Sequence, residues 1–298
     1  MMAVGADIWK GRWMVVALLD GQFASARVAS SLDAVREYLA DAAVIGIDVP
    51  IGLPSPGERR ESDRLTRAYI GPRWPSLFST PSIDLLEAPS HAKANELARA
   101  QGRRGISAQA YGLRAAILEV QVVARTDERM YEVHPEASFV RANGGGHLTW
   151  PKTSWNGAMQ RRRILAEQGI VLPDDLGPAG VAGPADVLDA AIAAWSANRI
   201  ALGTAVSLPE GAERVGAVWG SATASCLEHR RSRALRSLAA RASQRPVPIR
   251  CPNSRSLPGR VHERGPSGEV LDLAASESPG AKTEMPKCGR GLGASLSG

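Results

Sequence analysis

Cysteine is absent from the first 222 residues, because the three cysteines of this 298-residue chain are Cys226, Cys251 and Cys288. Their spacing matches no zinc-binding pattern, so we expect neither a zinc site nor disulfide bonds to build the fold. No apolar run reaches the ~20 residues that a membrane-spanning helix needs. The first residues form a strand-like run and not a secretion signal. The sequence therefore predicts a soluble cytoplasmic protein with no membrane partner.

Aromatic residues are absent from the C-terminal part of the chain, since all seven Trp, four Tyr and three Phe lie before residue 222. Residues 222–298 are rich in Arg, Ser, Pro and Gly. Such a segment cannot bury enough apolar surface to offset a chain entropy of ~1–2 kcal/mol per residue. We therefore predict one folded domain over residues 1–221 and a disordered basic tail over 222–298. The tail is either an arm that holds nucleic acid or an extension without a role.

The predicted domain also lacks an excess of positive charge. From Thr223 onward the chain holds 13 of its 36 lysines and arginines and 6 of its 30 acids, which leaves 23 and 24 before that residue. The formal net charge of +6 therefore originates in the tail. An attractive field for nucleic acid over the whole domain surface is excluded, so any basic patch on the domain is local.

The domain does contain several strand-like segments, and two of them end in aspartate. The apolar pattern predicts three strands joined by hairpins, a helix, and a buried fourth strand. These elements are expected over residues 3–8, 13–19, 23–29, 31–41 and up to residue 48. Asp7 ends the first strand and Asp48 the fourth. Each aspartate either binds a metal or caps a loop, and the apolar runs around them favour the metal because burying an uncompensated charge is costly.

The remaining pattern predicts a mostly helical second half with one more strand. Helices are expected over residues 59–70, 91–101, 108–124 and 156–168, with a fifth strand over 129–134 and a short helix from Glu136. A last helix begins near Pro184 and ends before Gly203, as Pro and Gly favour these two positions.

The last helix carries two acids on one face, because Asp186 and Asp189 are three residues apart. Alanines at 190, 193 and 197 keep the adjoining side slim, so the helix can lie close to a sheet. Acids at a helix start are also favoured by the helix dipole, by ~0.3–1 kcal/mol, so this pair alone is a weak signal. Together with Asp7 and Asp48 it predicts a carboxylate site for two divalent cations, Mg²⁺ or Mn²⁺, on either side of a phosphate.

Other polar residues are candidates for supporting roles. Glu132 shares a strand face with His134 and is either a further ligand, a general base, or an acid at the sheet edge. His134 either positions water or the leaving group, or simply makes a hydrogen bond. Lys152 and Arg161 either neutralise a phosphate or face solvent. Glu136 is interpreted as a helix cap. The arginines at 60, 64 and 67 form either a phosphate-facing ridge or, as we favour, a solvated helix face.

Several motifs together resemble a known family. They are Gly5-Ala6-Asp7, Ile47-Asp48-Val49-Pro50-Ile51-Gly52-Leu53, Arg60-x-x-Asp63 with Gly71, Ser76-Leu77-Phe78 with Pro81, Gly105-Ile106-Ser107-Ala108-Gln109-Ala110-Tyr111, Glu132-Val133-His134-Pro135-Glu136, Lys152 with Gly157 and Arg161, and Asp186-x-x-Asp189-Ala190. Each motif is weak alone. Jointly, over about residues 5–210, they resemble the predicted RNase H-like nucleases known as domain of unknown function 429. The Asp-x-x-Asp segment is also similar to the last catalytic helix of RuvC-type resolvases.

The resemblance implies an α/β fold, an RNase H-like mixed five-stranded sheet with flanking helices. In that fold the first and fourth strands are neighbours, so Asp7 and Asp48 would meet. It also implies a metal-dependent nuclease whose partner is DNA or RNA. Two departures qualify this expectation. The family usually has a doubled acid where this chain has Ala185-Asp186, and the family's closing segment fades after Leu208-Pro209-Glu210-Gly211.

Two other functions remain open. A non-catalytic RNase H-like binding module is consistent with the missing acid at Ala185. A nucleotide-binding relative, similar to actin-like ATPases and sugar kinases, needs a Gly-Thr or Gly-Ser turn after the first aspartate. This chain has Ile8-Trp9-Lys10-Gly11-Arg12 there, with no hydroxyl. The substrate's identity and the oligomeric state are not indicated by the sequence.

Overall fold

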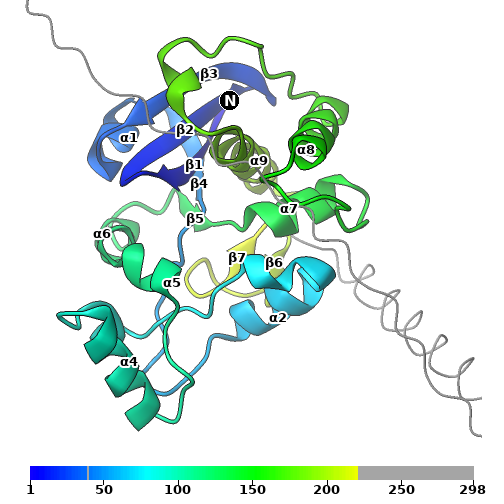
Figure 1. The fold of residues 1–298 in the computed structure, drawn as a ribbon. Helices are drawn as coiled ribbons and strands as arrows, with labels where there is room; N and C mark the ends of the chain where they lie inside the picture. Colours follow the sequence, from blue (N-terminus) through cyan, green and yellow to red (C-terminus); the bar gives the residue numbers. More distant parts are fainter. Residues whose placement is uncertain (39, 221–298) are drawn as a thin grey trace, which may run out of the picture. The chain divides into compact units, whose positions relative to one another are not determined.

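The computed structural model describes residues 1–38 and 40–220 (Figure 1). The predicted tail over 222–298 and its three cysteines therefore lie outside the described residues. No helix in the described part of the chain is both long enough and apolar enough to cross a bilayer.

A mixed five-stranded sheet forms the centre of the fold, as predicted. Its strands are β1 Met2–Trp9, β2 Arg12–Leu19, β3 Gln22–Ala29, β4 Ala42–Ile47 and β5 Met130–Glu132. The order across the sheet is β3-β2-β1-β4-β5. The hairpins make β1, β2 and β3 antiparallel, whereas β4 runs parallel to β1 and β5 runs parallel to β4. The first and fourth strands are therefore neighbours and end at the same edge of the sheet.

The predicted helices are present, except for one break, and the short helix α3 (Ile83–Leu86) was not predicted. They are α1 Leu32–Tyr38, α2 Glu61–Ile70, α3 Ile83–Leu86, α4 His91–Ala100, α5 Ala108–Gly112, α6 Arg114–Ala124, α7 Pro135–Ala142, α8 Trp155–Glu167 and α9 Pro184–Ala201, with 3₁₀ turns η1 Gly71–Ser76 and η2 Gly177–Val181. The predicted helix over 108–124 divides at Leu113, whose φ and ψ of −86° and 1° leave the helical region.

The chain keeps ordered structure beyond Gly211, where the sequence resemblance to the family fades. Two short strands, β6 Ser207–Leu208 and β7 Val218–Trp219, pair with each other after α9. Trp219 also forms a parallel bridge to Val133 and packs edge-on against Tyr131 at a centroid distance of 5.4 Å. The segment thus closes the domain beside β5.

Alternation along β1 assigns the two faces of the sheet to different helices. Val4 and Ala6 pack in a buried cluster with side chains of α1 and α6. The opposite face lies against α9, with α7 and α8 beside it (Figure 1). Asp7 follows Gly5 by two residues, so both face the α9 side of the sheet.

Two glycines allow α9 to lie very close to the sheet. Gly5 and Gly46 are partners across β1 and β4. A Cβ atom at Gly5 would collide with the backbone carbonyl oxygen of Ala190, and one at Gly46 would lie 2.7 Å from that of Ala193. The predicted slim side of the last helix is therefore the side that meets the sheet. This close approach brings the start of α9 over the ends of β1 and β4.

Candidate metal centre

Three of the four predicted aspartates converge at the carboxyl ends of β1 and β4. Asp7 is on β1, and Asp48 follows β4, where its backbone N–H donates to the Ala6 carbonyl and extends the parallel ladder. Asp189 is in the second turn of α9. Each of the three offers one carboxylate oxygen, and these oxygens lie within 4.8 Å of one another. The three side chains, hereafter the aspartate cluster, thus have the spacing of ligands to one cation.

The aspartate cluster carries more negative charge than the fold around it compensates. Burial, followed by repulsion from Asp48 and Asp189, raises the pKa of Asp7 well above its usual value. Burial and repulsion from Asp189 raise the pKa of Asp48 to about 8. Bringing ionised carboxylates together away from water is unfavourable unless a positive charge is present. The arrangement therefore favours a bound cation.

Lys152 supplies part of that positive charge. Its Nζ lies 2.5 Å from Asp189 Oδ2. Burial opposes the charge of Lys152, but attraction to Asp189, Asp48 and Asp7 outweighs it and raises the pKa of the ammonium. The other oxygen, Asp189 Oδ1, is buried and accepts no hydrogen bond within residues 1–38 and 40–220. An unsatisfied carboxylate oxygen among two other aspartates fits a metal ion, because hard divalent cations prefer oxygen ligands.

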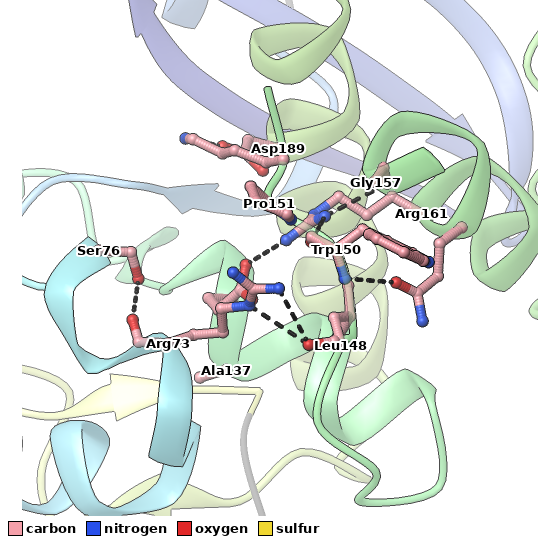
Figure 2. A network of polar contacts seen from close by, with 12 residues as sticks. Arg73, Ser76, Ala137, Leu148, Trp150, Pro151, Gly157, Arg161 and Asp189 are labelled. Atoms are coloured by element: carbon pink, nitrogen blue, oxygen red, sulfur yellow. Dashed lines mark hydrogen bonds and ion pairs between the residues drawn. The ribbon is translucent and has the colours of Figure 1, made fainter. Parts of the chain in front are cut away.

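The turn before Lys152 is held by two arginines (Figure 2). Arg161 donates to the Trp150 carbonyl at 3.2 Å, to the Gly157 carbonyl at 3.2 Å and to Glu136 Oε2 at 2.7 Å. From the other side, Arg73 donates to the carbonyls of Leu148 and Thr149, the latter at 2.5 Å. The backbone just before Lys152 is therefore held in place, and the Lys152 side chain extends from it to Asp189.

These contacts correct the interpretation of two residues. Arg161 is 1% exposed, so it is unavailable to neutralise a phosphate and serves instead as a buried clamp. Glu136 is a buried partner of Arg161, with Arg73 Nε 3.8 Å away, and not the cap of its helix. The His134 side chain provides the cap of α7. The sequence run Arg161-Arg162-Arg163 gave no sign that its first member is buried.

Asp186 lies beside the aspartate cluster but outside its group of three oxygens. It lines the same cleft and is partly exposed. Burial and repulsion from Asp189 raise its pKa, whereas Lys152 and Lys10 lower it. Asp186 is thus placed to bind a second cation or a ligand at the mouth of the cleft, and its predicted metal role stays a prediction.

Glu132 lines the cleft but is engaged by the surrounding fold. Its Oε2 accepts from Arg60 Nη2 at 2.6 Å and from the Ile51 backbone N–H at 2.7 Å. Burial raises the pKa of Glu132 to about 7, although Arg60 lowers it. These contacts favour positioning of the segment after β4 over direct proton transfer.

The arginines at 60, 64 and 67, at the start of α2 and within it, do not share one ridge. Arg60 is buried against Glu132, whereas Arg64 is exposed and pairs with Glu61. Arg67 lies over the Trp74 ring, with 5.4 Å to the ring centroid.

His134 lines the cleft as a neutral imidazole. Its Nδ1 accepts a long hydrogen bond, 3.4 Å, from the Ala137 backbone N–H. Burial and the nearby Lys152 lower the pKa of His134 to about 4. With Nδ1 as the acceptor, the single proton of the neutral ring resides on Nε2. His134 can therefore donate a hydrogen bond to a ligand in the cleft at neutral pH.

The cleft in front of the aspartate cluster has a volume of about 220 Å³. Part of the cleft lining is less polar and comes from segments that the sequence pattern did not mark as functional. It includes Leu77 and Phe78 after η1, and Gln109 and Leu113 from α5 and its end. Only the resemblance indicated these segments, through the motifs around Ser76 and Gln109.

Comparison with known proteins identifies a family but no characterised relative. No curated protein and no solved structure matches the chain significantly. One family model, described as a protein of unknown function (DUF429), matches residues 5–214. This span includes the whole aspartate cluster, Lys152 and His134, and it covers more than half of the sequence. The chain belongs to the DUF429 family.

Proposed function

We propose that this protein is a divalent-metal-dependent hydrolase of phosphodiester bonds in nucleic acid, built on an RNase H-like scaffold. One observation carries the proposal: three aspartates from β1, the end of β4 and α9, two of them buried and Asp48 partly buried, meet within 4.8 Å. Neighbouring parallel strands that both end in aspartate, with a third aspartate on a late helix, support the RNase H-like interpretation.

The ligand set favours Mg²⁺ or Mn²⁺. The aspartate cluster offers oxygen atoms only, which suits hard cations, whereas zinc sites usually include Cys or His. When bound there, a divalent cation supplies Lewis acidity toward a phosphoryl oxygen and activates water. The two-cation arrangement predicted from the sequence requires Asp186 in addition to the aspartate cluster.

The protein's own residues supply the remaining parts of the chemistry. Lys152 places a positive charge at the aspartate cluster, where it can stabilise the negative charge that builds on a phosphate during hydrolysis. The Nε2–H of His134 can donate to a phosphate oxygen or to the leaving oxygen. Arg161 and Arg73 keep Lys152 in place, and Arg60 keeps Glu132 in place.

A non-catalytic binding module is the second candidate. The Lys152–Asp189 ion pair favours it, because a lysine that neutralises the site makes a metal less necessary. A nucleotide-binding relative has no such support. Lys10 and Gly11, with φ of 50° and 73°, form a tight hairpin turn after Asp7 and not a phosphate-binding loop.

The decisive experiment combines cleavage with metal binding. The full chain is incubated with Mn²⁺ or Mg²⁺ and with single- and double-stranded DNA and RNA, with Asp7→Asn as the matched inactive variant. We expect cleavage by the wild type only and a metal site tighter than millimolar by calorimetry. Metal binding without cleavage of any substrate would contradict the hydrolase, and the absence of a metal site as well would favour the binding module.

A further inference from the structure

Exposed tryptophans lie in chain segments that contribute residues to the cleft. Trp74, Trp150 and Trp155 are 52%, 47% and 75% exposed, and Trp9 is partly exposed. These four of the chain's seven tryptophans are hereafter called the tryptophan rim. Large aromatic side chains gain by being buried, so several exposed ones in segments that form a cleft indicate a binding surface.

Each member of the tryptophan rim adjoins residues that line the cleft. Trp9 follows Asp7 and Ile8, and Trp74 precedes Ser76 by two residues. Trp150 and Trp155 lie on either side of Lys152 in the sequence. The η1 turn and the Trp150 turn are also joined directly, because Arg73, next to Trp74, donates to the carbonyl of Leu148 (Figure 2) and to that of Thr149. The four tryptophans therefore belong to the same chain segments as the residues of the candidate site.

Positive charges accompany the rings. Lys10 Nζ lies 5.1 Å from the Trp9 ring centroid, and Lys10 also lowers the pKa of Asp186 at the mouth of the cleft. Arg67 lies over the Trp74 ring. Arg163, whose side chain is 71% exposed, lines a hollow together with Trp150. Aromatic rings alternating with cations are typical of surfaces on which unpaired bases stack while cations contact the phosphates.

We propose that the tryptophan rim binds the unpaired bases of single-stranded nucleic acid and leads the strand across the aspartate cleft. The direction of the strand toward the aspartates rests on the proposed hydrolase function, whereas binding to the rim does not. The bases of a duplex already stack on one another and are not available to the rings.

Binding measured without catalysis tests this proposal. The full chain is titrated with labelled single-stranded 12-mers and matched duplexes in the presence of a chelator, with fluorescence anisotropy and intrinsic tryptophan fluorescence as readouts. We expect preference for the single strand, quenching of tryptophan emission, and an affinity reduced by about 5- to 150-fold for each stacking ring removed, as in Trp155→Ala or Trp150→Ala. Trp155→Phe should retain most of the affinity. Val122→Ala on α6, where the valine is 67% exposed, is the matched control and should bind like the wild type.

Two outcomes would overturn the proposal. Equal affinities of the wild type and the alanine variants for the single strand would show that the rings do not bind bases. Loss of self-association in Trp155→Ala, measured by light scattering, with unchanged affinity for nucleic acid, would make the rim an interface between copies of this chain. The hydrolase proposal is tested separately: weaker binding by the rim variants, with no cleavage by the metal-loaded wild type, would refute the hydrolase and retain the rim.

Discussion

Two buried acidic regions lie close together in this domain and are compensated in opposite ways. Glu136 is 5% exposed, lies 2.7 Å from Arg161, and has Arg73 as a second cation 3.8 Å away. The aspartate cluster places three carboxylates within 4.8 Å of one another, and Lys152 pairs with one of them. The first region has more guanidinium groups than carboxylates, whereas the second has more carboxylates than ammonium groups.

The difference separates charges that serve the fold from charges that serve a ligand. Burying an ion costs free energy in both regions. Around Glu136, the guanidinium groups of Arg161 and Arg73 offset this cost. The same two arginines also fix the backbone at the turn before Lys152. At the aspartate cluster the cost of burying charge is only partly offset. The raised pKa values of Asp7 and Asp48 show that their ionised forms are still unfavourable there. A site left short of positive charge inside a rigid frame is suited to bind a cation.

The largest expected change in stability comes from removing Arg161, the main partner of Glu136. Arg161→Met leaves Glu136 buried with Arg73 as a distant partner, and loss of one member of a buried pair costs ~3–5 kcal/mol. We expect a decrease of this size in the free energy of unfolding measured by urea denaturation. Arg163→Met is the matched control, because Arg163 is exposed, and should change stability by less than ~0.5 kcal/mol. A loss below ~1 kcal/mol in Arg161→Met would show that the ion pair contributes little to the fold.

At the aspartate cluster we expect a substitution to increase the free energy of unfolding instead of decreasing it. Near pH 7 the folded, metal-free protein holds Asp48 protonated at a cost in free energy, because its pKa is raised to about 8. Asp48→Asn removes this cost, so it should raise the unfolding free energy of the metal-free protein by about 1–3 kcal/mol. Thermal unfolding with and without Mn²⁺ measures this, and Mn²⁺ should stabilise the wild type but not the variant.

Asp127 provides the contrasting control. This buried carboxylate accepts hydrogen bonds from both Arg129 and Arg36. Asp127→Asn should therefore decrease stability, whereas Asp48→Asn increases it. If both variants lose stability, Asp48 serves the fold like Asp127 and the comparison between the two kinds of region fails.

Much of the site could be predicted from the sequence because it depends on strand ends and helix periodicity. Asp7 and Asp48 each end an apolar run, and parallel neighbouring strands bring such ends together. The choice between Asp186 and Asp189 could not be made, because residues three apart share a helix face. It is decided by the contact of α9 with Gly5 and Gly46, which places Asp189 and not Asp186 among the three oxygens.

The features that could not be predicted depend on contacts between segments that are distant in the sequence. Arg161 stands in a run of three arginines that is typical of a solvated helix, and only its partner Glu136, 25 residues away in sequence, makes burial possible. The strands β6 and β7 have two residues each, too few to show an alternating pattern. They are stabilised by packing beside β5 and not by local sequence.

The pH dependence of stability should also differ between the two kinds of region. Asp48 keeps its proton up to about pH 8 in the folded, metal-free protein but loses it near pH 3.8 when unfolded. Binding of this proton contributes its full share to the free energy of unfolding below pH 3.8. This contribution is lost as the pH rises through 8, with a slope of up to ~1.4 kcal/mol per pH unit. Asp127 has the opposite sign: hydrogen bonds from Arg129 lower its pKa, so its contribution is lost as pH falls below 3.8. Urea denaturation from pH 3 to 9 with a chelator measures both, and Asp48→Asn should reduce the loss above pH 4 while Asp127→Asn should not.

The smallest expected effect concerns Lys152, which belongs partly to each kind of region. Its backbone is fixed by Arg161 and Arg73, yet its ammonium group occupies Asp189 Oδ2, an oxygen that a metal would otherwise use. Lys152→Met removes a positive charge from the aspartate cluster and frees this oxygen, so Mn²⁺ should bind at least about fivefold more tightly, equivalent to ~1 kcal/mol. Calorimetry on the full chain measures the affinity and the stoichiometry, and Lys93→Met is the control, since Lys93 pairs with Glu96 on the exposed side of α4. A second bound cation in Lys152→Met would mean that the lysine takes the place of one metal of a two-cation site. Weaker Mn²⁺ binding in this variant would instead show that the clamped lysine organises the aspartates for the metal.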